Sequence, residues 1–392
     1  MRSIVLFAVF LCVACAPEER QELELEAGPG SAEPHLALGA DGTVLLSYLE
    51  PMQDGTALRY SQLNKNRWSK PKTVASGENW MVNWADFPSV MPLSKNTWAG
   101  HWLVKSEGPA YAYDAVVVVS TDQGQSWSDP LLLHTDGTLS EHGFVSLYAD
   151  SSGVGAVWLD GRAIANGGQN EAEFVGTQLR TAVVLGDQRR SEGVIDPVVC
   201  DCCQTDLAIA RSGPVTVYRN RTRAEIRDIY VAREVDGKWQ PGKLVSHDGW
   251  EITGCPVNGP AIDARDDQVV VAWFTAHPGN RIQVAFSTDS AQAFGDAIDV
   301  GAENPIGRVD VSLLKDGDAV VSWLEKGVGE LLIRRVSPEH GLGEIQRITK
   351  MASHRDAGFP QMIAREEELV FAWTDTSGDQ SRVRSLIVRI EG

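Results

Sequence analysis

Positive charge is scarce in this sequence. Its 392 residues contain 35 Lys and Arg against 53 Asp and Glu, which leaves a formal net charge of −18. Because nucleic acid is bound by clustered cationic groups, this balance argues against a nucleic-acid partner. A hydrophobic content of 43% and a mean hydropathy of −0.17 exclude a disordered chain and a polytopic membrane protein. The composition is that of a globular protein with a large buried core.

Common catalytic signatures are absent as well. The sequence has no HExxH zinc motif, no GxSxG nucleophile turn, no phosphate-binding glycine-rich loop and no CxxCH haem site. Each of these motifs supplies a specific chemical group at a defined spacing, so their absence argues against the corresponding enzyme classes.

The only long apolar run lies at the N-terminus, at residues 4–14 behind Arg2. It is far shorter than the roughly 20 residues of a membrane-spanning helix and predicts a signal peptide instead. Its end, Ala14-Cys15, resembles a bacterial lipobox, although Cys12 stands where that pattern usually has Leu. The resemblance implies cleavage before Cys15, lipidation of its thiol and export to the bacterial cell envelope, in the periplasm or at the outer membrane. The alternative is an ordinary signal peptide in which Cys15 has no role.

An apolar run that ends in an aromatic residue recurs along the chain. Its final aromatics are Tyr48, Trp102, Trp158, Tyr218, Trp273, Trp323 and Trp373, at steps of 54, 56, 60, 55, 50 and 50 residues. This period is typical of a β-propeller blade. Within a unit, short Val-rich runs separated by turn residues indicate four antiparallel strands, because they are too short for helices.

The seventh unit is short of one strand, because the chain ends soon after its third run, SLIVRI. Residues 22–26 alternate strictly between Glu and Leu and are expected to supply the missing strand, which would close the ring and remove its open edges. We therefore predict an all-β fold, a β-propeller of seven four-stranded blades over residues 22–392. A signal peptide at 1–14 and a tether at 15–21 would precede it. Six blades with a modified first unit is the alternative.

One turn, at residues 120–127, resembles the Asp box S-x-D-x-G-x-x-W of sialidases and related BNR-repeat propellers. Asp and Ser side chains can hydrogen-bond turn amides, Gly tolerates positive φ, and Trp fills the space behind the turn. A second copy at residues 287–294 has Ala in place of Gly. In that family the boxes are structural turns remote from the catalytic face, so the resemblance implies the fold. The defining residues here are Ser120, Asp122, Gly124 and Trp127.

Resemblance to sialidases would also imply an arginine triad, a Tyr nucleophile paired with Glu, and an acid/base Asp. This sequence does not match those positions. Its first unit lacks the Arg-Ile-Pro segment, its final unit has no tyrosine, and its seven units differ from the six blades of sialidases. Whether the protein is an enzyme is therefore left open.

Loops that enter the innermost strand or leave the second strand of each blade share one end of a propeller's channel, where ligand sites concentrate. Arginines at even spacing along an extended segment could point together at an anion. A solvated ion-pair network, in which Glu225, Asp228 and Asp160 neutralise the arginines, is the alternative. A carboxylate pair for glycoside hydrolysis would need a suitable separation. Candidate ligand-binding residues are Arg162, Arg219, Arg221, Arg227, Asp86 and Asp160, with Asp206 and Glu251 as further carboxylates and Trp80, Trp84 and Trp250 as stacking platforms.

Four cysteines remain once Cys12 and the lipidated Cys15 are set aside: Cys200, Cys202, Cys203 and Cys255. Disulfides are the preferred interpretation in an oxidising compartment, with a bond from Cys202 or Cys203 to Cys255 joining neighbouring blades. The other two cysteines, being close in sequence, would form a more reducible bond. In the alternative, reduced thiols bind copper or zinc together with His142 or His354.

Taken together, these features predict an exported, lipid-anchored, sialidase-like propeller that binds or hydrolyses a carbohydrate or other anionic ligand at the channel mouth. The competing hypothesis is a non-enzymatic scaffold of the cell envelope that binds a protein partner or a thiol-liganded metal. We expect a monomer that contacts the membrane through its lipid anchor only, with no cofactor other than copper or zinc.

Overall fold

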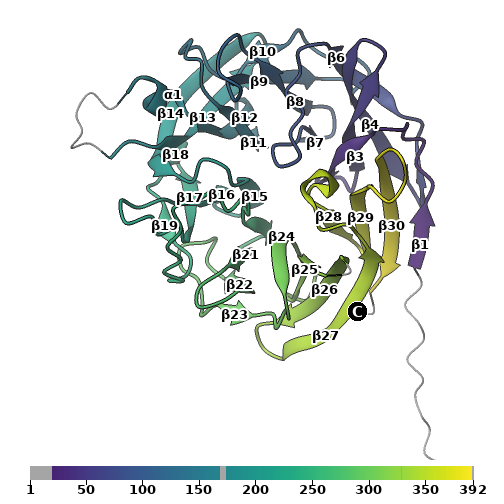
Figure 1. Cartoon of the computed structure of the whole chain (residues 1–392), viewed down its shortest axis with the longest axis vertical. Helices are drawn as coiled ribbons and strands as arrows, with labels where there is room; N and C mark the ends of the chain where they lie inside the picture. Colours follow the sequence, from purple (N-terminus) through teal and green to yellow (C-terminus); the bar gives the residue numbers. More distant parts are fainter. Residues whose placement is uncertain (1–19, 168–173, 328, 391–392) are drawn as a thin grey trace, which may run out of the picture.

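The computed structural model describes residues 20–167, 174–327 and 329–390. In this part of the chain seven antiparallel sheets are arranged around a central axis, as Figure 1 shows. The protein is thus a seven-bladed β-propeller, which confirms the predicted fold and rules out the six-bladed alternative. Within the described residues, no helix combines the length and the apolar character needed to cross a bilayer.

Each blade follows chain order outward from the channel, except the seventh. Blade one contains β2 (Ala32–Leu38), β3 (Val44–Met52), β4 (Gly55–Asn64), β5 (Arg67–Trp68) and β6 (Lys72–Gly77). Blade two contains β7 (Ser89–Pro92), β8 (Trp98–Lys105), β9 (Tyr113–Ser120) and β10 (Leu131–Leu132). Blade three contains β11 (His142–Asp150), β12 (Gly153–Asp160), β13 (Thr177–Leu185) and β14 (Gln188–Val199). A short helix, α1 (Arg162–Ala165), follows β12.

Blade four contains β15 (Asp206–Ala210), β16 (Gly213–Arg219), β17 (Ile229–Val235), β18 (Lys238–Trp239) and β19 (Lys243–Leu244). Blade five contains β20 (Ala261–Arg265), β21 (Gln268–Thr275), β22 (Arg281–Ser287) and β23 (Ile298–Asp299). Blade six contains β24 (Pro305–Leu313), β25 (Ala319–Glu325), β26 (Glu330–Ser337) and β27 (Gly341–Lys350). In the first and fourth blades the outer strand is divided, because β5 and β6 both pair with β4, and β18 and β19 both pair with β17.

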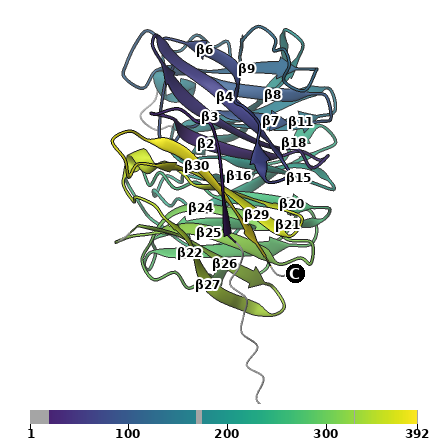
Figure 2. The same cartoon turned by 90° about the vertical axis from the view of Figure 1, so that its right-hand side faces the viewer.

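The seventh blade closes the ring. It contains β28 (Gln361–Arg365), preceded by the 3₁₀ turn η1 (Arg355–Ala357), then β29 (Glu368–Asp375), β30 (Arg382–Arg389) and, on its outer edge, β1 (Arg20–Leu23). β1 runs antiparallel to β30, with Glu22 opposite Leu386, and the two strands lie side by side in Figures 1 and 2. The N-terminal strand therefore completes the last blade.

The closing strand lies earlier than predicted: it begins at Arg20 rather than at residue 22 and ends at Leu23. Residues 24–26 leave the sheet because the chain must cross from the outer edge of blade seven to the innermost strand of blade one. Residues 20 and 21 thus belong to the propeller, and not to a tether. The predicted signal peptide, Cys15 and the tether up to residue 19 lie outside the described residues.

The core lies between neighbouring blades. Trp158, Trp273 and Trp323, three of the recurring aromatics, have no exposed surface. Trp273 packs among apolar side chains of blades four and five, and Trp323 among those of blades five and six. Because each second strand is covered on both faces, its sequence is apolar without alternation.

The turn at residues 120–127 has the hydrogen bonds expected of it. The Ser120 hydroxyl donates to Asp122 and accepts from the Gly124 amide, while Asp122 Oδ1 accepts from the Ser126 amide. The copy in blade five repeats this pattern, with the Ala291 amide donating to the Ser287 hydroxyl. Both turns therefore form although one has lost its glycine.

Candidate functional site

The innermost strands enclose a channel cavity of about 250 Å³. All seven blades contribute to its wall, and the wall is rich in polar groups. The cavity is therefore a candidate ligand site held on the most rigid part of the fold.

Three carboxyls in this wall bridge neighbouring blades. Asp206 accepts a hydrogen bond of 2.9 Å from the Ile262 amide, and Asp263 accepts one of 2.7 Å from the Leu313 amide. Asp310 likewise accepts a 2.7 Å bond from the next blade, at the amide of Met362. Each carboxyl therefore ties one innermost strand to the next around the channel.

These carboxyls favour the protonated form. The channel walls separate them from bulk solvent, and this burial raises the pKa of Asp206 to about 7 and that of Asp263 to about 6. Burial, with repulsion from Asp206 and Asp263, also raises the pKa of Asp310 well above its usual range. This part of the wall therefore carries less negative charge near pH 6 than three ordinary aspartates would, whereas at pH 7 Asp263 is largely ionised and Asp206 about half ionised.

Two histidines in the wall are uncharged as well. Burial lowers the pKa of His35 to about 4, and burial together with the neighbouring His35 lowers that of His101 to about 3. His101 Nδ1 is 2.8 Å from the Ser89 hydroxyl. Within the described residues, His35 Nδ1 and His101 Nε2 are buried and have no hydrogen-bond partner. The His35 ring is partly exposed and lines the cavity, so it can contact a ligand there.

At the channel mouth, polar side chains connect the loops of successive blades. Asp86 is buried, where its carboxyl accepts from the Phe144 amide at 2.7 Å and from the Tyr113 hydroxyl at 3.0 Å. Burial raises the pKa of Asp86 to about 7. Gln204 donates to the carbonyl of Ala85 and accepts from the Gly259 amide. These bonds give Asp86 a positioning role within the mouth.

The four predicted arginines do not converge on one open position. Arg219 is 1% exposed and donates to the backbone carbonyls of Asn258, Arg227 and Phe274. Arg221 pairs with Glu225 at 2.7 Å, and Arg227 pairs with the same carboxylate at 2.9 Å.

Arg162, the fourth, is held by acidic groups between blades two and three. It contacts Asp160 and Glu192 at 2.7 Å each and Asp136 at 3.2 Å. Every one of the four guanidinium groups has partners inside the protein, and Arg162, Arg221 and Arg227 lie in ion pairs. A ligand role for Arg162, Arg219, Arg221, Arg227 and Asp160 stays a prediction.

His142 belongs to a histidine cluster rather than to the cysteines. Its ring stacks on that of His134, with 3.5 Å between the ring centroids. Nε2 of His142 lies 3.4 Å from Asp136 and 3.8 Å from Asp160. Among the described residues, groups close enough to share a metal ion place His142 with Asp and His side chains, and the cysteines with one another or with Asp201. A joint site of His142 and the cysteines is therefore not assembled.

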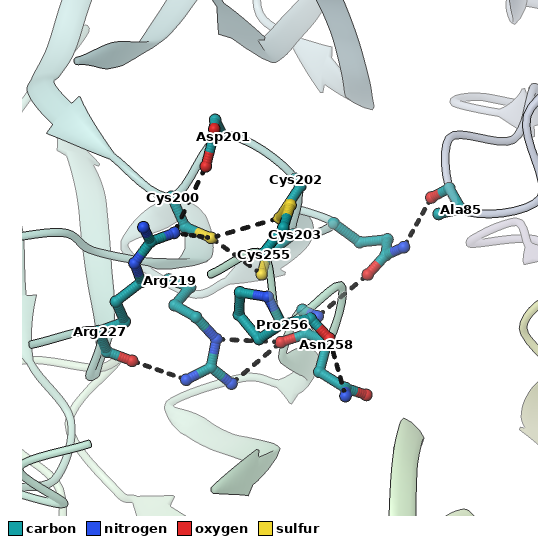
Figure 3. Close-up of a disulfide and its surroundings, with 12 residues drawn as sticks. Ala85, Cys200, Asp201, Cys202, Cys203, Arg219, Arg227, Cys255, Pro256 and Asn258 are labelled. Atoms are coloured by element: carbon teal, nitrogen blue, oxygen red, sulfur yellow. Dashed lines mark hydrogen bonds and ion pairs between the residues drawn. A yellow bond between two sulfur atoms is a disulfide. The ribbon is translucent and has the colours of Figure 1, made fainter. Parts of the chain in front are cut away.

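The cysteines form one cluster at the mouth, shown in Figure 3. Cys202 and Cys255 form a disulfide, which confirms the predicted covalent link between blades four and five. Cys200 and Cys203 are free, buried thiols whose sulfurs lie 3.1 Å apart. Both thiols and the disulfide therefore share one small volume.

Two further residues lie at the mouth: Glu141, which the sequence did not point to, and Trp84, which the sequence did not set apart from Trp80 and Trp250 as a stacking platform. Glu141 is half-buried, and burial, with the nearby Asp201 and Asp86 carboxylates, raises its pKa to about 7. Trp84 is also partly exposed and stacks on Phe359 with 5.8 Å between ring centroids. Trp80 and Trp250 are buried instead, so they are not platforms.

The repeat contained a signal for two channel residues that were not predicted, Asp310 and His35, through their alignment with the predicted Asp206. Asp206 and Asp310 occupy the same position in their blades, each paired with the residue that precedes the aromatic end of the second strand. His35 aligns with them in blade one. Recurrent polar residues at a position facing the axis could thus have indicated a polar channel.

No family model matches the sequence, and no curated protein does. Several solved structures are similar in fold. They include the polysaccharide lyase Uly1 (TM-score 0.54, 9% identity, 89% of this chain and 88% of that one). An α-L-arabinofuranosidase of Fusarium graminearum, solved with arabinobiose, matches with TM-score 0.51 and 11% identity over 92% and 93% of the two chains. An α-L-arabinanase of Penicillium chrysogenum, also with arabinobiose, matches with TM-score 0.50 and 12% identity over 95% and 99%. At these identities the similarity shows the fold alone.

Proposed function

We propose that the protein binds a neutral carbohydrate in its central channel. The observation that carries this proposal is the weakly charged polar wall, in which carboxyls with raised pKa and imidazoles with lowered pKa face one cavity. Sugar hydroxyls both donate and accept hydrogen bonds, and protonated carboxyls and neutral imidazoles offer both functions. The partly exposed Trp84 at the mouth adds an aromatic surface for a sugar ring.

The neutral character of the ligand follows from the charges around it. An anionic sugar would need a free cation, but Arg221, Arg162 and Arg219 are occupied by Glu225, Asp160 and backbone carbonyls respectively. A cation would need ionised carboxylates, which burial disfavours here. Similar folds that act on sugar polymers, or were solved with arabinobiose, support a sugar as the ligand class.

Titration calorimetry at pH 6 with neutral and anionic oligosaccharides tests this proposal. We expect at least one neutral arabino-, gluco- or galacto-oligosaccharide to bind, and His35→Phe to weaken that binding at least about tenfold. His35 is suited to the test because its ring lines the cavity and is partly exposed. Leu132→Gln, an exposed position on the outer strand β10, is the matched control.

Binding of only anionic sugars would contradict the neutral wall, and unchanged binding by His35→Phe would contradict the channel as the site. Thermal melts of the variants show whether any loss of binding reflects a loss of folding.

A hydrolytic activity is a second candidate, favoured by Glu141. A carboxyl with a pKa of about 7 can serve as a proton donor at neutral pH, and Asp201 is the neighbouring carboxylate. If the protein cleaves the oligosaccharide that it binds, Glu141→Gln should lower the rate at least about a hundredfold and leave the affinity within about threefold. Equal rates for the variant and the parent would exclude Glu141 as the proton donor, and no cleavage by the parent would assign the protein to binding alone.

We also propose that the protein is exported and anchored by a lipid at Cys15. Arg2, the apolar run at residues 4–14 and the Ala14-Cys15 step support this. The Cys202–Cys255 disulfide is consistent with an oxidising compartment.

A further inference from the structure

The cysteine centre consists of Cys200, Cys202, Cys203 and Cys255 and joins the loops before β15 and β20. Cys200 Sγ lies 3.1 Å from Cys203 Sγ and 3.9 Å from Cys202 Sγ. Cys202 is bonded to Cys255, which is exposed, whereas Cys200 and Cys203 are 1% and 2% exposed. One buried thiol therefore lies within reach of two possible disulfide partners, and one member of the existing disulfide faces solvent.

We propose that this cluster is a thiol–disulfide exchange centre, in which the Cys202–Cys255 disulfide passes inward to Cys200 and Cys203 and leaves Cys255 as a reactive thiol at the mouth. Its external substrates are thiols and disulfides that can reach the exposed Cys255 sulfur. The proposal is independent of carbohydrate binding.

The exchange takes place in two steps. In the first, the Cys200 thiolate attacks Cys202 Sγ, the bond from Cys202 to Cys255 breaks, and its electron pair leaves on Cys255, which takes up the proton that Cys200 released. In the second, the Cys203 thiolate attacks Cys200 Sγ and releases Cys202, which takes up the proton of Cys203. Two thiols and one disulfide are present before and after, so no external oxidant or reductant is consumed.

The surroundings of Cys200 favour its role as the attacking group. Burial opposes ionisation, but hydrogen bonds from the Cys203 thiol and the Cys202 amide, with the positive charges of Arg227 and Arg219, lower the pKa of Cys200 to about 7. Nη1 of Arg227 is 3.3 Å from Cys200 Sγ, a contact drawn in Figure 3. A thiolate with a pKa near ambient pH is the most effective attacking species.

Cys203 is suited to act second. Burial and the neighbouring Cys200 raise the pKa of Cys203 well above its usual range, so it is a thiol while Cys200 is a thiolate. Once Cys200 is part of a disulfide, its charge no longer opposes ionisation of Cys203. The two buried cysteines thus react in a defined order.

The exposed end of the centre makes the exchange observable from outside. Cys255 has no thiol in the starting state, so an alkylating reagent can modify it without added reductant only after internal exchange. Detergent-solubilised full-length protein is incubated with excess maleimide, quenched in acid and mapped by peptide mass spectrometry. We expect labelling of Cys255 in the parent and at least about tenfold slower labelling in Cys200→Ser.

Cys203→Ser separates the two steps. It blocks the second attack but leaves the first, so Cys255 should still be labelled, with Cys200 bonded to Cys202. The rate of labelling in the parent, with maleimide in excess, should rise around pH 7, where Cys200 ionises. This second measurement needs no variant, and it holds even if Cys200→Ser fails to fold.

Three results would overturn the proposal. One is an unlabelled Cys255 alongside intact Cys200 and Cys203 thiols, which would make the disulfide static. Another is the absence of any free thiol among the four cysteines, which would indicate two permanent disulfides. The third is stoichiometric copper or zinc held by the thiols, which would make the cluster a metal site.

Discussion

Buried ionisable side chains in this protein avoid an unsolvated charge in one of two ways. The Arg219 guanidinium donates its N–H groups to backbone carbonyls of two loops and a strand end, so the protein itself solvates it. Asp206 lies where burial disfavours charge, and its raised pKa favours the protonated form instead. An arginine cannot lose its proton and must be solvated by the protein, whereas a carboxyl can neutralise itself.

The raised carboxyl pKa values predict an unusual pH dependence of stability. Asp86 and Asp206 have folded-state pKa values of about 7, above the value in an unfolded chain, so the folded state binds protons first as the pH falls from 8. The free energy of unfolding should therefore rise between pH 8 and about 6.5. Below that range the unfolded chain also binds protons at His35 and His101, which stay neutral in the folded state, so the further gain from the carboxyls is partly offset and the rise should flatten.

Urea denaturation as a function of pH checks this prediction. Asp206→Asn, which keeps the acceptor oxygen but cannot ionise, should remove about 1 kcal/mol of the change between pH 8 and 6.5. Asp129→Asn, at an exposed position, is the control and should leave the profile unchanged. A stability that falls steadily from pH 8 to pH 6.5 in the parent would contradict the assigned protonation.

At the scale of the element, the blades depend on turns whose backbone conformation is demanding. Gly124 has φ of 73°, and a Cβ there would lie 2.5 Å from the Tyr60 hydroxyl oxygen. Ala291 occupies the matching place in blade five with φ of 61°. The side chain–amide hydrogen bonds are thus strong enough to hold a left-handed residue that is not glycine.

Replacing Gly124 by Ala and Ala291 by Gly should have opposite effects on the free energy of unfolding. Gly124→Ala should lower the free energy of unfolding by about 2 kcal/mol, through the left-handed backbone and the contact with Tyr60. Ala291→Gly should raise it by about 0.5 kcal/mol, because relief of strain exceeds the added entropy of the unfolded chain. Urea midpoints measure both; a stabilising Gly124→Ala would show that the turn relaxes.

At the scale of the whole molecule, closure joins the two ends of the described chain. β1 and β30 hold the ring shut, while the segment before residue 20 leads to Cys15. A lipid on Cys15 would therefore attach to the propeller at the outer edge of its closing blade.

Export and anchoring make a prediction of their own. If the protein is lipidated at Cys15, Cys15→Ser should move it from the membrane fraction to the soluble fraction of a bacterium that produces it, because the acyl chains would be lost. Cys12→Ser is the matched control, since residue 12 leaves with the signal peptide and should not change the distribution. A mature N-terminus at any residue other than Cys15 in the parent would contradict lipidation.

Several features were predictable from particular residues. The spacing from Tyr48 to Trp373 predicted seven blades, since each aromatic marks a buried second strand. The alternation in residues 22–26 predicted closure, but not that pairing would start at Arg20, because the register depends on where β30 offers partners. For Cys255 the sequence narrowed the partner to Cys202 or Cys203, and the structure selected Cys202.

What the sequence determined by itself was local and periodic: strand length, burial on both faces, the turns that hold their own amides, and the N-terminal apolar run. Only the tertiary structure decided which ionisable side chains are buried, which partners they have and which protonation state they favour. Arg219 and Arg221 look alike in sequence, yet one is buried among carbonyls and the other pairs with Glu225. Protonation and access depend on solvent and neighbours within a few ångströms, and those neighbours come from other blades, about fifty residues away along the chain.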